Sequence, residues 1–252
     1  MFEAYQHLLV PVLAGVVGGF FRGFAGFGFG MAAVPILILS LLPVHAVPAV
    51  LIHEVAIGAA TAPAAWKDAA WRRLGPLIAG SLIGTPVGLT MLQVIPAAHI
   101  RPLIGALVLA SVILLWTMPT LRFRLTHASF AAAGLVSGVL NGSTAASGPP
   151  AILLLFASDR SPTQTRSLLV LFIFASAVIA LAIAAVSGLI ILPVIEIAAA
   201  MLPGVLAGAL GGHLLFKRLH TRHYRSISLA LLFAVSIVTL GLTLIRSIQR
   251  GS

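Results

Sequence analysis

One arginine, Arg22, lies inside an apolar stretch of the chain, in a run of glycines and phenylalanines at residues 19–30. An ionisable residue between apolar segments is costly unless something binds it, so it indicates a functional site. Its guanidinium offers a planar fork of N–H donors that matches the oxygens of a small anion. The alternative is a structural arginine that binds backbone carbonyls or pairs with Glu54. Arg22 is therefore the first candidate for contact with an anion.

A second glycine-rich segment, at residues 138–150, carries neutral donors instead of a charge. Both segments expose backbone N–H groups, and short helices that start near Gly28 and Pro149 would direct the positive ends of their dipoles toward the same region. The alternative role for these residues is close helix packing, with side chains bonded to local backbone. The predicted anion-binding residues are Arg22, Gly23, Gly26, Gly28, Asn141, Gly142, Ser143, Thr144, Ser147 and Gly148.

Two further ionisable residues, His53 and Glu54, lie in the middle of another apolar segment. A carboxylic acid inside a membrane can exchange a proton, as a proton-coupled carrier requires, and a neighbouring histidine can assist. The alternative is a fixed ion pair with Arg22 or a hydrogen-bonded contact between helices. His53 and Glu54 are therefore the candidates for proton coupling.

Long apolar segments must position these residues, because 60% of the 252 residues are hydrophobic and only 8% are charged. Soluble domains carry about 25% charged residues. Two apolar regions, 8–42 and 128–157, are interrupted by the glycine-rich breaks, so we expect each to hold two pieces of about 14 residues or fewer, too short to cross a bilayer alone. Six other segments have a spanning length: 45–65, 74–92, 102–118, 167–187, 193–216 and 226–245. The sequence predicts an all-α, polytopic membrane bundle.

The same sequence argues against several kinds of function. The chain has no cysteine, so disulfides, thiolate chemistry and cysteine-bound metals are excluded. It shows no nucleotide-binding loop, hydrolase elbow or zinc-protease helix. The net charge of +10 is spread over short loops rather than gathered in one patch, which argues against nucleic acid as a partner. We therefore expect no enzyme activity, no metal and no cofactor.

The basic residues predict how the interrupted regions lie in the membrane. If both regions crossed once, the lysines and arginines outside the first region would divide seven against seven, contrary to the excess expected on the cytoplasmic face. If both are re-entrant hairpins, the division is eleven against three. The eleven are Lys67, Arg72, Arg73, Arg122, Arg124, Arg160, Arg166, Lys217, Arg218, Arg222 and Arg225, and the three are Arg101, Arg246 and Arg250. We predict hairpins, with both termini outside the cytoplasm.

An internal repeat predicts the same topology. A shift of 119 residues superposes three glycines and places Arg22 on Asn141, and a shift of 124 superposes three more glycines and a His-x-Arg triplet. The superposed residues are Gly15, Gly19 and Gly23 on Gly134, Gly138 and Gly142, then Gly80, Gly84 and Gly88 on Gly204, Gly208 and Gly212, and His99 to Arg101 on His223 to Arg225. These matches predict two homologous halves, 8–118 and 128–245, within a single membrane domain of residues 1–252. Each half is one hairpin and three crossings, so the second half lies inverted. The spans' glycine stripes, 80–88 and 204–212, favour close helix packing.

The paired breaks resemble those of the TauE/SafE family of sulfite and organosulfonate exporters. The similar segments are Gly19 to Gly30 leading to Val34-Pro35, and Gly138 to Gly142 leading to Ser147-Gly148-Pro149-Pro150, with Arg166 at the start of the span that follows. Length, two-half layout and glycine-spaced spans are similar too, over nearly the whole chain. Phe27 and Phe29 differ, because the family often has small residues there. The resemblance implies a transporter of sulfite or an organosulfonate in a bacterial inner membrane.

The leading hypothesis is a secondary transporter that exposes a midplane anion site to each side of the membrane in turn. Its partners are then a small anion, the lipid bilayer and a coupling proton or cation, and formation of a homo-oligomer is left open. The alternatives are an anion channel and a carrier of another small anion, such as a carboxylate or sulfate. An intramembrane enzyme is disfavoured, because no nucleophile is paired with a base.

Overall fold

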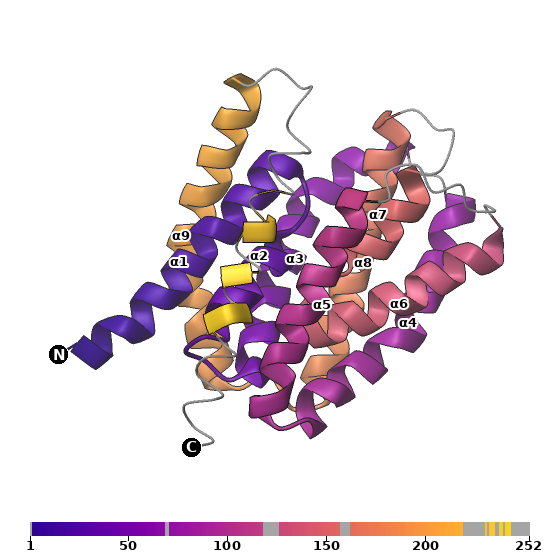
Figure 1. The fold of residues 1–252 in the computed structure, drawn as a ribbon. Coiled ribbons are helices and arrows are strands. Elements are labelled where there is room, and N and C mark those ends of the chain that lie inside the picture. Colours follow the sequence, from indigo (N-terminus) through magenta and orange to yellow (C-terminus); the bar gives the residue numbers. More distant parts are fainter. Residues whose placement is uncertain are drawn as a thin grey trace.

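The chain is described here from a computed structural model (Figure 1). The structure describes residues 2–68, 71–117, 126–156 and 162–218, together with 230, 232–234, 237–238 and 240–242. Within these residues the secondary structure is helical and contains no strand. The predicted all-α class is therefore confirmed.

Five helices are long and apolar enough to cross a membrane in the described part of the chain. They are α3 (Pro43–Ala65), α4 (Trp71–Val94), α5 (Ala97–Thr117), α8 (Pro162–Val186) and α9 (Leu192–Arg218), with a 3₁₀ turn, η1 (Trp66–Asp68), after α3. They correspond to five of the six predicted spans. The sixth prediction, 226–245, falls for the most part outside the described residues. The protein is thus a multi-pass membrane protein.

The two interrupted regions each form one long and one short helix. The first contains α1 (Phe2–Ala25) and α2 (Phe29–Leu37), and the second contains α6 (His127–Thr144) and α7 (Gly148–Phe156). The prediction of two short pieces was wrong for the first helix of each region, its long arm, since α1 has 24 residues and α6 has 18. It was right for the second helix, the short arm, since α2 and α7 have nine residues each. The physical reason is that the glycines in α1 and α6 remain helical, because they pack against neighbouring helices.

Both long arms end in the same way. The N–H of Gly26 donates to the carbonyl of Arg22 at 3.0 Å, and the N–H of Ala145 donates to the carbonyl of Asn141 at 2.8 Å. Gly26 and Ala145 adopt positive φ angles of 79° and 51°, which terminates each helix in a left-handed residue. Arg22 and Asn141 therefore hold equivalent positions, four residues before the break.

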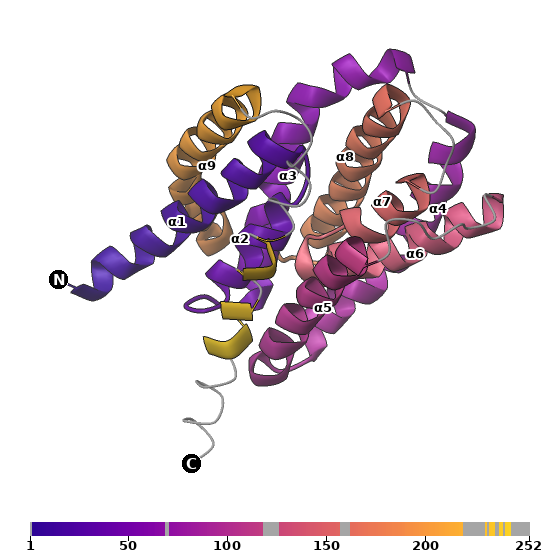
Figure 2. The same ribbon diagram turned by 45° about the horizontal axis from the view of Figure 1, so that its top comes forward.

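Two pairs of helices pack backbone to backbone. Helix α1 lies along α9, and α4 lies along α6, on opposite sides of the bundle (Figure 2). A Cβ added at any glycine of these contacts would fall well inside van der Waals distance of a carbonyl oxygen on the facing helix. These glycines are Gly15, Gly19, Gly23, Gly204, Gly208 and Gly212 in the first pair, and Gly80, Gly84, Gly88, Gly134, Gly138 and Gly142 in the second. The predicted close-packing role of the glycine stripes is confirmed.

The short arm α2 lies in the interior. Eight of its nine residues are buried, and it packs against α1 and α3. The long helices α3 and α8 pack on each other beside it, where Gly58 approaches Phe174. Broken backbone inside a membrane must be buried in protein or line a cavity, because lipid offers no hydrogen bonds. The fold thus encloses the first break within long helices.

Candidate functional site

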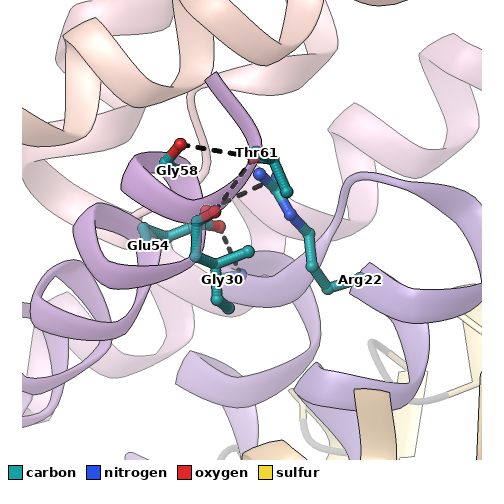
Figure 3. Close-up of polar contacts among 6 residues, drawn as sticks. Arg22, Gly30, Glu54, Gly58 and Thr61 are labelled. Carbon is teal, nitrogen blue, oxygen red and sulfur yellow. Dashed lines mark hydrogen bonds and ion pairs between the residues drawn. The ribbon is translucent and has the colours of Figure 1, made fainter. Parts of the chain in front are cut away.

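Three elements meet at the end of α1. Arg22 lies in the last turn of α1, Gly30 in the first turn of α2 and Glu54 in the middle of α3 (Figure 3). Nη1 of Arg22 lies 3.6 Å from Oε2 of Glu54, and the N–H of Gly30 donates to Oε1 of Glu54 at 3.4 Å. Arg22 is 7% exposed and Glu54 is 5% exposed. The carboxylate of Glu54 is therefore held between a guanidinium and the start of a helix.

The hydrogen-bonding capacity of this ion pair is largely unused. Nη1 and Nη2 of Arg22 and Oε2 of Glu54 are buried and have no hydrogen-bond partner among the described residues. The distance of 3.6 Å between the two charged groups exceeds the 2.7–3.2 Å typical of an N–H···O hydrogen bond. A guanidinium offers five N–H donors, so the donors on Nη1 and Nη2 remain available to a further acceptor.

Helix dipoles favour both charges where they lie. Arg22 is near the C-terminus of α1, where the partial charge is negative, and Glu54 contacts an N–H at the N-terminus of α2, where the partial charge is positive. Arg22, His53 and Glu54 are the only buried ionisable residues among those whose side chains the structure describes. The site therefore contains one cation and one acid that balance each other.

His53, the neighbour of Glu54 in the sequence, serves a different contact. Its Nε2–H donates to the backbone carbonyl of Ala198 in α9 at 2.9 Å, and its ring lies 5.9 Å from that of Phe29. The ring of His53 thus contacts α2 and α9, whereas the carboxylate of Glu54 contacts Arg22 and Gly30. The arrangement matches the alternative prediction of a hydrogen-bonded helix contact for His53.

The second break carries a neutral hydrogen-bond network. Nδ2 of Asn141 donates to the carbonyl of Ser176 at 2.9 Å and to its Oγ at 3.0 Å. Oγ of Ser176 lies 2.8 Å from Oγ of Ser81, and the hydroxyl of Thr85 donates to the carbonyl of Ser81 at 2.7 Å. All four residues are buried, and they join α4, α6 and α8. Sequence reasoning missed Ser81, Thr85 and Ser176, although polar residues four positions apart in an apolar span are a usable signal.

Most other predicted site residues make local or packing contacts. The hydroxyls of Ser143 and Thr144 donate to the carbonyls of Val139 and Leu140 in their own helix, at 2.8 and 2.7 Å. Residues 23 and 142 belong to the glycine contacts described above, each beside a carbonyl of the facing helix. The remaining four predicted residues lie in the breaks themselves or at their edge: Gly26, Gly28, Ser147 and Gly148.

The two breaks touch each other. A Cβ added at Gly30 would fall well inside van der Waals distance of the carbonyl group of Ala145. Gly30 also bonds Glu54, and Ala145 bonds Asn141. A direct chain of contacts therefore links the charged site of the first break with the neutral network of the second. The two breaks lie together, as expected, and their position at the membrane midplane stays a prediction.

A family model described as "Sulfite exporter TauE/SafE" matches residues 11–239, most of the chain. No curated protein and no solved structure gives a significant match. The extent of the family match agrees with the paired breaks and the five apolar helices described above. This chain belongs to the TauE/SafE family of membrane transporters.

Proposed function

We propose that this protein is a secondary transporter of sulfite or an organosulfonate, with Arg22 as the residue that binds the anion. The observation that supports this function is the pair of guanidinium nitrogens, Nη1 and Nη2, which are buried without a hydrogen-bond partner in the described part of the chain. A planar guanidinium presents parallel donors to two oxygens of a sulfonate or sulfite group. The family match supports the same class of substrate.

We also propose that residues 8–118 and 128–245 form two inverted halves that expose the site to each side of the membrane in turn. Packing supports this architecture, because the contact of α1 with α9 is matched by that of α6 with α4, and the contact of α3 with α9 by that of α8 with α4. Two such halves can rock against each other around a fixed site between them. In a bacterial inner membrane, the basic connectors then face the cytoplasm and both termini face outward.

The arrangement of the helix ends supports this topology. The ends of α7 and α9, which lead into two basic connectors, lie toward the top of Figure 1, whereas the turn between α4 and α5 lies at the bottom. Single cysteines at the exposed positions Lys67, Arg218 and His99 test it, because the natural chain has no cysteine. We expect the first two to react with a membrane-impermeant thiol reagent from the same side and the third from the other. Labelling of positions 67 and 218 from opposite sides would exclude the two-hairpin topology.

The binding function is tested by anion-dependent thermal stabilisation of the purified protein with sulfite, methanesulfonate, 2-hydroxyethanesulfonate, sulfate and acetate. We expect sulfite or a sulfonate to bind best and Arg22→Ala to weaken that binding about a hundredfold, equivalent to about 2.7 kcal/mol. Arg22→Lys should recover part of the affinity, because it keeps the charge and loses the planar fork. Arg72→Ala, which removes an arginine at an exposed position, is the control.

Two outcomes would contradict the proposal. Unchanged anion affinity in well-folded Arg22→Ala would exclude Arg22 as the anion-binding residue. Single-channel currents in reconstituted bilayers, in place of a saturable flux into proteoliposomes, would identify the protein as an anion channel rather than a carrier.

A further inference from the structure

We propose that the carboxylate of Glu54 occupies the binding site of the transported anion, and that the anion displaces it from Arg22 while Glu54 takes up a proton. This inference rests on the proposed function and names its coupling ion. Each monoanion would then cross the membrane together with one proton, bound at Glu54.

The first argument is the chemistry of the groups that hold Glu54. Its two oxygens face a guanidinium at 3.6 Å and a backbone N–H in the first turn of α2 at 3.4 Å. A cation and a helix N-terminus are two kinds of group that commonly bind free oxyanions in proteins. The protein thus presents to its own carboxylate the donors that a sulfonate needs.

The second argument is the length of these contacts. Both distances exceed those of ordinary charge-assisted hydrogen bonds, which are about 2.7–2.9 Å. Oε2 of Glu54 and both terminal nitrogens of Arg22 lack a hydrogen-bond partner among the described residues. The internal ion pair therefore leaves most of the donor capacity of Arg22 to an incoming anion, and a loosely held carboxylate is readily displaced.

The third argument is charge balance. A monoanion that joined an ionised Glu54 would place two negative charges beside one guanidinium in a buried site, and a buried charge without a partner tends to be neutralised. One proton from the water on the side of entry removes this excess by forming an O–H bond on the Glu54 carboxyl group. On the opposite side the anion leaves, the proton returns to water, and Glu54 pairs again with Arg22.

Arg22, His53 and Glu54 are the buried ionisable side chains in the described part of the chain, and His45, the other histidine of α3, is half-buried. Helix α2 has no ionisable residue, and His53 is bonded to Ala198 of α9. Glu54 itself contacts Arg22 of α1. The other ionisable residues with described side chains on the elements that pack against α3 are all outside the buried set: Lys67, Arg72, Arg73, His99, Arg101, His127, Arg166, Glu196, His213, Lys217 and Arg218. Glu54 is therefore the group that exchanges the proton.

The sign of the expected pH dependence follows from this exchange. Displacement of an ionised Glu54 takes up a proton, so anion affinity increases as the pH falls, by up to tenfold per pH unit. The increase ends at the pH where Glu54 is already protonated in the anion-free protein. Glu54→Gln places a neutral side chain of similar size in the same position, so its affinity should be independent of pH and equal to the low-pH limit of the natural protein.

Calorimetry with methanesulfonate and 2-hydroxyethanesulfonate tests the inference. These sulfonates stay ionised throughout the accessible pH range, so any proton that is taken up enters the protein. Titration in two buffers with different ionisation enthalpies gives the number of protons bound per anion. We expect about one for the natural protein near neutral pH, close to zero for Glu54→Gln, and about one again for the matched control His53→Gln.

The outcomes separate this inference from the proposed function. Binding without proton uptake, with the same affinity at every pH, would overturn the role of Glu54 and leave the anion site at Arg22 standing. The natural protein alone gives this result, so the test does not depend on the folding of Glu54→Gln. If none of the tested anions binds to the folded natural protein, the proposed function itself fails, and this inference fails with it.

Discussion

The ends of the two long broken helices make an instructive comparison. Arg22 and Asn141 lie at the same position before their breaks and superpose when the sequence is shifted by 119 residues. Each contacts a residue on a long apolar helix, Glu54 on α3 and Ser176 on α8. The first pair is charged, and its N···O distance of 3.6 Å is too long for a hydrogen bond. The second pair is neutral and hydrogen-bonded, at 2.9 and 3.0 Å.

The two residues differ in how many of their hydrogen-bond donors are free to bind a ligand. Both hydrogen bonds that the amide nitrogen of Asn141 donates go to Ser176, so this nitrogen has no donor left for a ligand. The guanidinium of Arg22 keeps two buried nitrogens without partners in the described chain. Burying unused donors lowers stability, so their presence indicates a function outside the fold itself. Under the proposed function, the first break binds the anion and the second supports the packing of α4, α6 and α8.

The strongest test of this difference replaces the charged pair of the first break with the neutral pair of the second. The double variant Arg22→Asn with Glu54→Ser places the residues of the second break in the first. We expect it to lose anion binding by about a hundredfold or more, because no cation remains. It should melt at a higher temperature than Arg22→Asn alone, which leaves the carboxylate of Glu54 buried without a partner.

The complementary change, Asn141→Ala, should mainly lower stability. It removes the two buried hydrogen bonds that Asn141 donates to the carbonyl and the hydroxyl of Ser176, a loss of about 2 kcal/mol. Anion affinity in the folded fraction should change less than threefold or so, because Arg22 is intact. Melting temperature and calorimetric affinity, measured on the same sample, decide the matter. An affinity loss as large as that of Arg22→Ala would place Asn141 in the binding site.

The contact between the breaks offers a second pair of variants. Gly30→Ala would drive a methyl group into the carbonyl of Ala145 and should cost about 1–3 kcal/mol, with a loss of anion transport in proteoliposomes. Gly148→Ala is the matched control at the other break, where the added methyl meets only the side chain of Ile152, at 3.2 Å or beyond. Equal effects of the two changes would show that this close approach does not matter.

The helix pairs on opposite sides of the bundle should respond alike. Gly208→Ala and Gly84→Ala each place a methyl against a backbone carbonyl of the facing helix, and we expect each to lower stability by about 1–3 kcal/mol. Gly211→Ala and Gly75→Ala lie on the same two helices, and no atom of the described residues lies within 4 Å of the added Cβ. These controls should be neutral or stabilising by less than about 1 kcal/mol in melting experiments, because alanine favours the helix.

Much of this architecture could be predicted from local patterns. Apolar length sufficed for the five described spans, and glycine spacing predicted the close packing of α4 and α9. The glycines of α1 and α6 misled the prediction of helix length, because glycine signals both interruption and close packing. Only the neighbouring helix decides between the two, and a single sequence does not show which helix that is.

The sequence predicted which kinds of residue form the candidate site, but only some of the contacts between them. The sequence offered a pair of Arg22 with Glu54 as the structural alternative to contact with an anion, and the structure places the two side chains together. Ser176 could not be assigned to Asn141 from spacing, because 35 residues separate them and the contact depends on how α6 crosses α8. For Ser143 and Thr144 the sequence left two roles open, contact with the anion or hydrogen bonds to the local backbone. The structure shows hydrogen bonds to carbonyls of their own helix.

The smallest expected effect concerns the residues that follow the two long helices. Gly26 and Ala145 both adopt a left-handed conformation, which costs about 1–2 kcal/mol for an alanine and little for a glycine. Within the part of the chain that the structure describes, no atom lies within 4 Å of a Cβ added at Gly26, so Gly26→Ala should lower stability by about 1 kcal/mol through its backbone alone. Ala145→Gly relieves the same strain and loses a buried methyl worth about 0.8 kcal/mol, so a gain below about 1 kcal/mol is expected. Melting curves of both variants test this sign, and a clear loss of stability in Ala145→Gly would show that the methyl supports the contact with Gly30.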